Sequence, residues 1–129
     1  MNWFANVFAN PWFLVGVGGA AGSCARFGVG QLMQQAFASQ PIPLATTIVN
    51  LIGSFALGCI VGAVAQDKSS PMYLMLGVGL CGGFTTFSTF SMELVEHMQQ
   101  GRMAYAFGEC MIHITLGTIL FFAGLWVCR

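Results

Sequence analysis

Four apolar runs, each about long enough to cross a membrane as a helix, alternate with short connections along the whole sequence. They cover approximately residues 12–32, 44–66, 72–98 and 105–127, and a membrane-spanning helix needs about 20 predominantly apolar residues. Only 6% of the 129 residues are charged, whereas a soluble domain carries about 25%. The sequence therefore predicts an all-α membrane protein in which residues 1–129 form a single transmembrane domain of four helices.

The few basic residues are divided equally between the two sides of such a bundle. With four spans, Lys68 and Arg129 flank one face of the membrane, and Arg26 and Arg102 flank the other. Orientation normally follows an excess of Lys and Arg on one side, and this chain has no such excess. Insertion in both orientations would give an antiparallel homodimer, the two-chain equivalent of an inverted repeat. The alternative is that partners or folding order select one orientation.

Several classes of protein do not fit this composition. The five cysteines lie in or beside the apolar runs without paired spacing, so neither a disulfide framework nor a cysteine metal site is expected. No nucleophile–base pair or metal-ligand cluster can be recognised, so an enzyme is not expected either. The expected surroundings are membrane lipid, with no nucleic-acid partner. Because one thin bundle can hardly shield a polar pathway from lipid, we expect at least a dimer.

The third apolar run is interrupted by Gly82–Ser91, a stretch rich in glycine, hydroxyl and phenyl groups. Adjacent glycines weaken a helix, and Ser and Thr hydroxyls compete with the backbone for hydrogen bonds. We therefore expect the third helix to break near its middle. In a membrane, the backbone groups released by a break must be satisfied by protein, an ion or water. The alternative is a packed core whose hydroxyls bond back to their own helix.

Three polar residues elsewhere in the spans are candidates for the same site, each with a structural alternative. Asn50 could orient side chains along a pore, or it could simply bond to a neighbouring helix. Arg26 could offer donors to an anion at a cavity mouth, or its side chain could reach up to the interface. Glu93 shares a helical stripe with Thr86 and Thr89, so it lies either at the end of a polar track or at the end of the span.

The last span and the end of the third span contain further ionisable residues. Glu109 and His113 are four residues apart on one helical stripe, where they could relay protons or pair with each other. Glu96 and His97 are close to the end of the third span, where we expect both side chains to be in water.

The central stretch contains groups that suit a small anion. Phe87 and Phe90 lie on one side of a helix, and a phenyl ring has a positive edge that can face an anion. Hydroxyls alternate with the rings as neutral donors, so an ion could be held without being trapped. Carbonyls released at Gly82–Thr85 are hard oxygen ligands, and two such breaks crossing in a dimer would suit one buried Na⁺.

The motif at Gly82–Glu93, Gly-Gly-Phe-Thr-Thr-Phe-Ser-Thr-Phe-Ser-Met-Glu, resembles the signature of the Fluc fluoride channels, also called the CrcB family. The resemblance extends to Thr46, Asn50 and Gly53 in the second span, to Arg26 at the close of the first, and to length, span number and charge balance. It therefore covers nearly the whole chain. The fourth span departs from the family pattern, which often has a Tyr and Ser/Thr track there, whereas this chain has Glu109, His113 and two threonines.

The resemblance implies a channel that exports fluoride passively from the cytoplasm across the bacterial inner membrane and relieves fluoride toxicity. It implies an antiparallel homodimer with two pores and a structural Na⁺ at the interface, held by the carbonyls of Gly82 and Thr85. The implied fluoride pathway consists of Asn50, Phe87, Phe90, Ser88, Thr89, Glu93, Thr118 and Arg26. The alternative function is a proton-coupled exporter of the small multidrug-resistance type, which would need an isolated carboxylate in the first span, and there is none.

Overall fold

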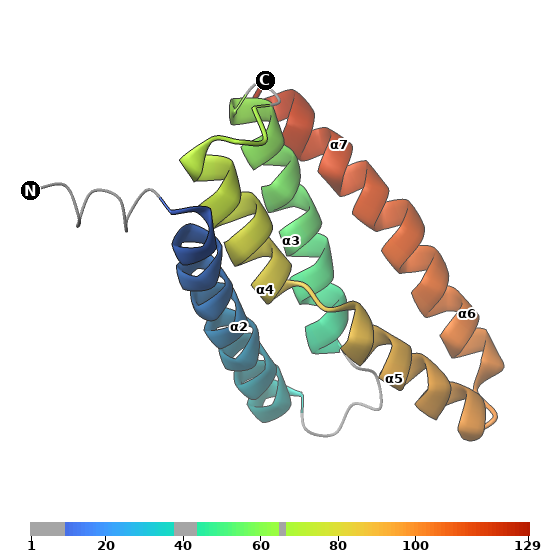
Figure 1. Ribbon diagram of the computed structural model, residues 1–129. Coiled ribbons are helices and arrows are strands. Elements are labelled where there is room, and N and C mark those ends of the chain that lie inside the picture. The colour runs from blue at the N-terminus through green and yellow to red at the C-terminus, as the bar shows by residue number, and fades with distance from the viewer. Residues whose placement is uncertain (1–9, 38–43, 65–66) are drawn as a thin grey trace, which may run out of the picture.

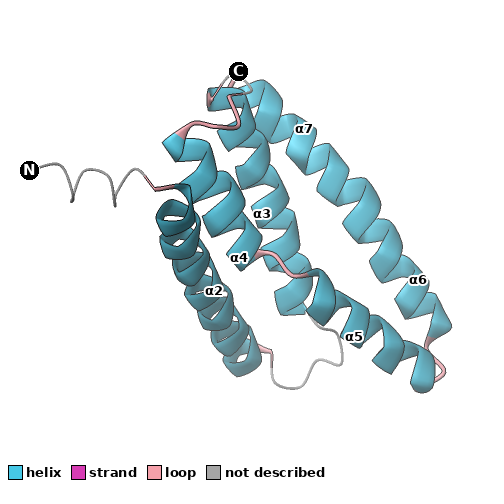
Figure 2. Cartoon of the chain, viewed as in Figure 1, coloured by secondary structure: helices cyan, strands magenta, loops and turns pink. Residues whose placement is uncertain are grey.

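The computed structural model describes residues 10–37, 44–64 and 67–129, and these residues form helices and short connections without strands (Figure 2). Four of the helical stretches are long and apolar enough to cross a membrane. They cover Pro11–Ala36, Leu44–Ala63, Tyr73–Gln99 and Met103–Val127. The expectation of an all-α protein with four spans is confirmed at this level. The predicted end of the second span at Gln66 lies outside the described residues.

The first helix, α2 (Pro11–Ala36), is longer than hydropathy predicts. Its start is fixed by Asn10, whose side-chain oxygen accepts a hydrogen bond from the Trp12 amide at 2.9 Å. The helix continues four residues beyond the predicted end at residue 32, through a polar turn that hydropathy does not count but that has good helix formers. Arg26 consequently lies ten residues before the end of α2 and does not close the helix.

The second half of the chain is built from six consecutive segments. The third span contains the π-helical segment η1 (Tyr73–Cys81), the short α4 (Gly82–Phe84) and α5 (Phe87–Gln99). Between α4 and α5, the backbone of Thr85 and Thr86 is extended. The fourth span runs without interruption through α6 (Met103–Met111), the π-helical η2 (Ile112–Leu116) and α7 (Gly117–Val127), as Figure 1 shows. Gly101, which has φ of 71°, supplies the left-handed turn between α5 and α6.

Two helix pairs make most of the contacts in the bundle, and both depend on glycine. α3 (Leu44–Ala63) packs along α7, and α2 packs along η1 and α4 (Figure 1). A methyl group added to Gly58 would overlap the Phe121 carbonyl oxygen of α7, and one added to Gly22 would overlap the Leu80 carbonyl oxygen of η1. Small residues therefore allow the backbones to approach closely, as expected for helices packed within a membrane.

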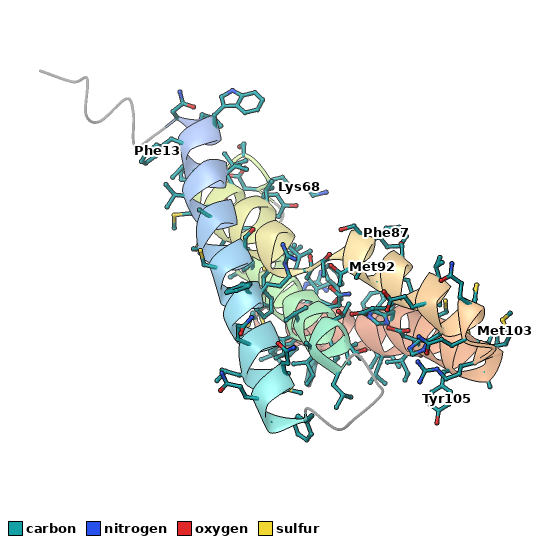
Figure 3. The ribbon with its side chains drawn as sticks, turned by 90° about the horizontal axis from the view of Figure 1, so that it is seen from below. Phe13, Lys68, Phe87, Met92, Met103 and Tyr105 are labelled. Atoms are coloured by element: carbon teal, nitrogen blue, oxygen red, sulfur yellow. The ribbon has the colours of Figure 1, made fainter. Side chains whose placement is uncertain are left out.

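The third span changes direction at Thr85 and Thr86. η1 and α4 run beside α2, whereas α5 leaves α2 and reaches the turn to α6 (Figure 1). Seen from below, the α5–α6 end, marked by Met103 and Tyr105, projects away from α2 (Figure 3). The interruption thus opens the bundle on both sides of α5.

At the opposite end of the molecule, the turn after α3 and the C-terminus lie together (Figure 1). Asp67 shapes this turn, because its Oδ1 accepts hydrogen bonds from the Ser69 hydroxyl at 2.6 Å and the Ser69 amide at 3.0 Å. These hydrogen bonds stabilise the carboxylate and lower the pKa of Asp67.

Candidate functional site

The extended backbone at Thr86 is held by one side chain from another helix. The Thr86 amide donates to Asn50 Oδ1 at 2.8 Å, and Asn50 Nδ2 donates to the Thr86 carbonyl at 3.1 Å. A backbone N–H can only donate and a carbonyl can only accept, so this pairing also fixes which amide atom is which. Asn50 therefore supplies the acceptor that the Thr86 amide lacks, and it adds a second donor to the Thr86 carbonyl, which as the N-cap carbonyl also accepts the first hydrogen bond of α5. Its second Nδ2–H makes no hydrogen bond within the described part of the chain.

The hydroxyl groups beside the interruption cap the two helix ends. Thr86 is the N-cap of α5, and its Oγ1 accepts from the Thr89 amide at 3.2 Å. The amide and hydroxyl of Thr85 both donate to the Cys81 carbonyl at 2.9 Å. Since the Thr86 amide donates to Asn50, it does not donate to the Gly82 carbonyl four residues earlier. The carbonyl of Gly82 is thereby released from helical bonding.

A pocket of about 570 Å³ lies on one side of the interruption. Its lining combines Asn50 of α3 and His113 of η2 with Phe87 and Phe90 at the start of α5. The ring centroids of Phe87 and Phe90 are 5.9 Å apart, and the Phe90 and His113 ring centroids are 4.4 Å apart. Phe87 is 79% exposed and projects outward from α5 (Figure 3). The pocket is thus lined by aromatic rings and uncharged polar groups.

A second pocket of about 560 Å³ opens on the other side of the interruption, between α2, α3 and α5. Arg26, Thr46, Thr89 and Glu93 line it, and Thr86 lines both pockets. Arg26 Nε donates to the Gly83 carbonyl at 3.1 Å, and the Thr46 hydroxyl donates to Glu93 Oε1 at 2.6 Å. Both charged side chains are therefore anchored inside the bundle, beside the Thr86 backbone.

Seven of the eight predicted pathway residues lie in or beside the two pockets. Six line a pocket, and Ser88 is exposed beside them, with its Oγ 3.3 Å from Thr86 Oγ1. Thr118 lies elsewhere, because it is exposed on α7 and its hydroxyl donates to the Ile114 carbonyl at 2.6 Å. Gly82 and Thr85, the predicted sources of carbonyl ligands, both line the aromatic pocket.

The ionisable residues near the α5–α6 turn differ from expectation in their burial and in their partners. His97 was expected in water but is only 4% exposed, because α6 returns along α5 and covers it. The Glu109 carboxylate faces this imidazole, with Oε2 3.8 Å from His97 Nε2. It does not pair with His113, whose Nδ1 is instead 2.9 Å from the Glu109 backbone carbonyl. A Glu109–His113 side-chain pair, one of the two interpretations of their spacing, is therefore wrong, and the sequence alone does not identify His97 as the partner of Glu109.

Two features of the site were not predicted from the sequence. One is the hydrogen bond from Thr46 to Glu93, which joins α3 to α5, and the other is the contact between His113 and Phe90. The stripe containing Glu93 was visible, but its partner is 47 residues away in sequence. Among the described residues, no group of three or more His, Cys, Asp and Glu side chains could hold a metal ion. Any cation at this site would need backbone or hydroxyl oxygens.

Comparison with known proteins places this arrangement in a family. Residues 13–125 match the family described as CrcB-like protein, Camphor Resistance (CrcB). The chain is 44% identical over 116 residues to the fluoride-specific ion channel FluC of Idiomarina loihiensis, covering 89% of this chain and 86% of the relative. Proteins with the same name in Paraburkholderia phymatum and Gloeothece citriformis are 39% and 36% identical, covering 86% and 90% of this chain and 88% and 94% of theirs. The chain therefore belongs to the CrcB family.

Proposed function

We propose that this protein is a fluoride-selective channel that lets F⁻ leave the cytoplasm passively across the bacterial inner membrane. The observation that carries the proposal is the pocket in which Phe87, Phe90 and Asn50 meet at the interruption of the third span. The names of the related proteins, fluoride-specific ion channel, support the same conclusion. No covalent chemistry is required of the protein.

The groups in this pocket suit an anion that must be bound and released quickly. Asn50 uses one Nδ2–H to hold Thr86, so the other is free to donate to an ion in the pocket that it lines. The ring edges of Phe87 and Phe90 supply a weak positive potential without a fixed charge. Fluoride gives up its water shell only where several donors replace it, and neutral donors avoid the tight binding that would stop conduction.

The charged residues of the second pocket suit the entrance to such a pathway. Within residues 10–37, 44–64 and 67–129, Arg26 is bonded through Nε alone, so its other guanidinium N–H groups are available to an anion. Thr46 holds Glu93 by one carboxylate oxygen, on the same side of the interruption. Thr86, which lines both pockets, connects this region to the aromatic pocket. We propose that Arg26 attracts fluoride and that the Ser88 and Thr89 hydroxyls lie along its route, with Glu93 near the end.

An antiparallel homodimer with two pores completes the proposal. Large apolar side chains are exposed on all four spans, and Phe87 is among the most exposed of them, so one copy leaves its aromatic pocket incompletely enclosed. A second copy packed over this face would enclose it, and the equal division of basic residues is compatible with opposite orientations. At the dimer axis, the carbonyls of Gly82 and Thr85 would hold Na⁺. Open space around Gly82 and the release of its carbonyl fit that role.

Fluoride release from liposomes tests the function. Reconstituted protein should release fluoride to an external electrode without a pH gradient, once a potassium ionophore allows charge balance. A proton-coupled exporter would instead take up cationic drugs only when a pH gradient is imposed. No fluoride release above that of protein-free liposomes would refute the channel.

Substitution of Phe87 by isoleucine tests the aromatic pocket within this assay. The change keeps an apolar side chain but removes the ring, so we expect fluoride release to slow at least about tenfold. Phe122, which is 62% exposed on α7 and lines neither pocket, provides the matched control Phe122→Ile. Both variants should elute from a sizing column like the wild type. Equal release by the two variants would remove the Phe87 ring from the mechanism.

A further inference from the structure

His113 occupies an unusual position for an ionisable side chain. It lines the aromatic pocket from η2 and lies against Phe90 at a centroid distance of 4.4 Å, with an angle of 41° between the ring planes. It therefore adjoins one of the two rings that we propose contact fluoride, and the proposed function has given it no role.

The hydrogen bonds of His113 define what its free nitrogen can do. Nδ1 is 2.9 Å from the Glu109 carbonyl, which can only accept, so Nδ1 carries a proton. Nε2 is buried and has no hydrogen-bond partner among the described residues. In the neutral ring, Nε2 is a lone-pair acceptor that repels an anion. In the protonated ring, Nε2 becomes an N–H donor and the side chain acquires a positive charge.

Other ionisable groups around His113 do not supply this donor. Cys81 of η1 and Cys110 of α6 line the same pocket, and the polar residues that α3 contributes to it, Asn50 and Ser54, have no ionisable group. The Glu109 carboxylate faces His97. Glu93 of α5 lines the other pocket, where it is bonded to Thr46. Among the described residues that line the aromatic pocket, His113 is therefore the one side chain whose protonation would add a charged donor.

We propose that His113 is a fluoride-binding residue of the aromatic pocket and that its protonation makes fluoride binding, and hence fluoride flux, dependent on pH. The inference rests on the proposed function, because it needs fluoride to pass Phe90. The neutral ring leaves binding to Asn50 and the phenyl edges, whereas the protonated ring adds one charge-assisted hydrogen bond. A bond of this type strengthens binding by about tenfold or more.

Flux measured at symmetric pH values tests the proposal. Between pH 8 and pH 5.5, the fluoride concentration that half-saturates release should fall about tenfold in the wild type, after subtraction of leakage from protein-free liposomes. His113→Gln places a neutral amide near the position of Nε2 and should remove the dependence. The chain has only two histidines, so His97→Gln is the matched control and should keep it. An unchanged dependence in His113→Gln, or its loss in His97→Gln alone, overturns the proposal.

A measurement on the wild type covers the case in which a variant fails to fold. Coupling between two ligands is reciprocal, so fluoride must raise the proton affinity of the imidazole by the same tenfold that protonation raises fluoride binding. Imidazole NMR signals followed over pH with and without NaF should therefore show one histidine that responds to fluoride and one that does not, with NaCl as the control salt. If neither responds while fluoride release is normal, the role of His113 is refuted and the channel stands. If there is no fluoride release at any pH, the channel itself is refuted, and the inference with it.

Discussion

Replacement of Asn50 by alanine removes the only side chain that bonds to both backbone groups of Thr86 in the described structure. The wild-type amide accepts from the Thr86 N–H at 2.8 Å and donates to the Thr86 carbonyl at 3.1 Å. Alanine can do neither, and the Thr86 amide has no helical acceptor to return to, because the backbone before α5 is extended. The Thr86 amide would be left to the water that can enter the pocket beside it, whereas the Thr86 carbonyl, as the N-cap carbonyl, keeps the first hydrogen bond of α5.

The loss in the free energy of unfolding depends on how many backbone groups are left without a hydrogen bond. A buried backbone donor or acceptor without a partner costs about 1–3 kcal/mol, and Asn50→Ala leaves one such group, the Thr86 amide. Water in the adjacent pocket offsets part of this cost, and polar contacts between membrane helices average about 0.6 kcal/mol. We therefore expect Asn50→Ala to lower the free energy of unfolding by about 1–2 kcal/mol.

Unfolding of the detergent-solubilised protein in SDS, followed by far-UV circular dichroism at fixed protein concentration, measures this loss. Ser54→Ala is the matched control, because Ser54 lies one turn further along α3, lines the same pocket and donates only to the Asn50 carbonyl of its own helix at 2.8 Å. Its removal should cost less than about 1 kcal/mol. Equal losses in the two variants would show that Asn50 does not hold the interruption.

Asn50→Asp separates the two halves of the contact. A carboxylate can still accept from the Thr86 amide, but it places a second oxygen against the Thr86 carbonyl where Nδ2 donated before. It also adds a negative charge to the aromatic pocket. We therefore expect fluoride release to fall even in protein that remains folded. Release at the wild-type rate would refute the assignment of an Nδ2–H donor to the ion pathway.

Two further predictions concern packing and the turn at the far end of the molecule. Gly58→Val should prevent close packing of α3 on α7, because its side chain would overlap the Phe121 carbonyl, whereas Gly28→Ala, with open space around it, should change stability by less than about 1 kcal/mol. SDS unfolding compares the two variants. Since hydrogen bonds from Ser69 lower the pKa of Asp67, the stability from this contact is present above the unfolded-state pKa and lost as pH falls through the lower folded-state value. Ser69→Ala should raise the pKa of Asp67 in an NMR titration, and an unchanged pKa would contradict this cause.

The sequence predicts the four spans because hydropathy depends on composition over about 20 residues, and each span is at least that long. The predicted ends of the spans are less accurate. α2 extends to Ala36 because glutamine continues a helix as readily as apolar residues do, although it lowers the hydropathy. The π-helical segments η1 and η2 were not predicted, since no local pattern in Tyr73–Cys81 or Ile112–Leu116 distinguishes them from α-helix.

The candidate site was predictable in its residue types but not in its pairings. Asn50 and Glu93 stood out because amides and carboxylates are costly in hydrocarbon. Their partners, Thr86 and Thr46, are 36 and 47 residues away, and only the packing of α3 against the third span brings them together. The burial of His97 was likewise not predictable from its local sequence. Its position near a helix end indicates exposure, but α6 returns along α5 and buries it.

Asn50 therefore has two tasks that constrain each other. The carboxamide group has one acceptor oxygen and two N–H donors, and Thr86 engages the oxygen and one of the donors. Serine or threonine has only a single donor, so neither could hold the Thr86 carbonyl and still offer a second donor to an ion. Glutamine has the same groups on a longer side chain and would have to fold back to reach the same backbone. This geometry explains why an asparagine is suited to this position, whereas the hydroxyls of Thr85 and Thr86 can satisfy the remaining ends of the interruption.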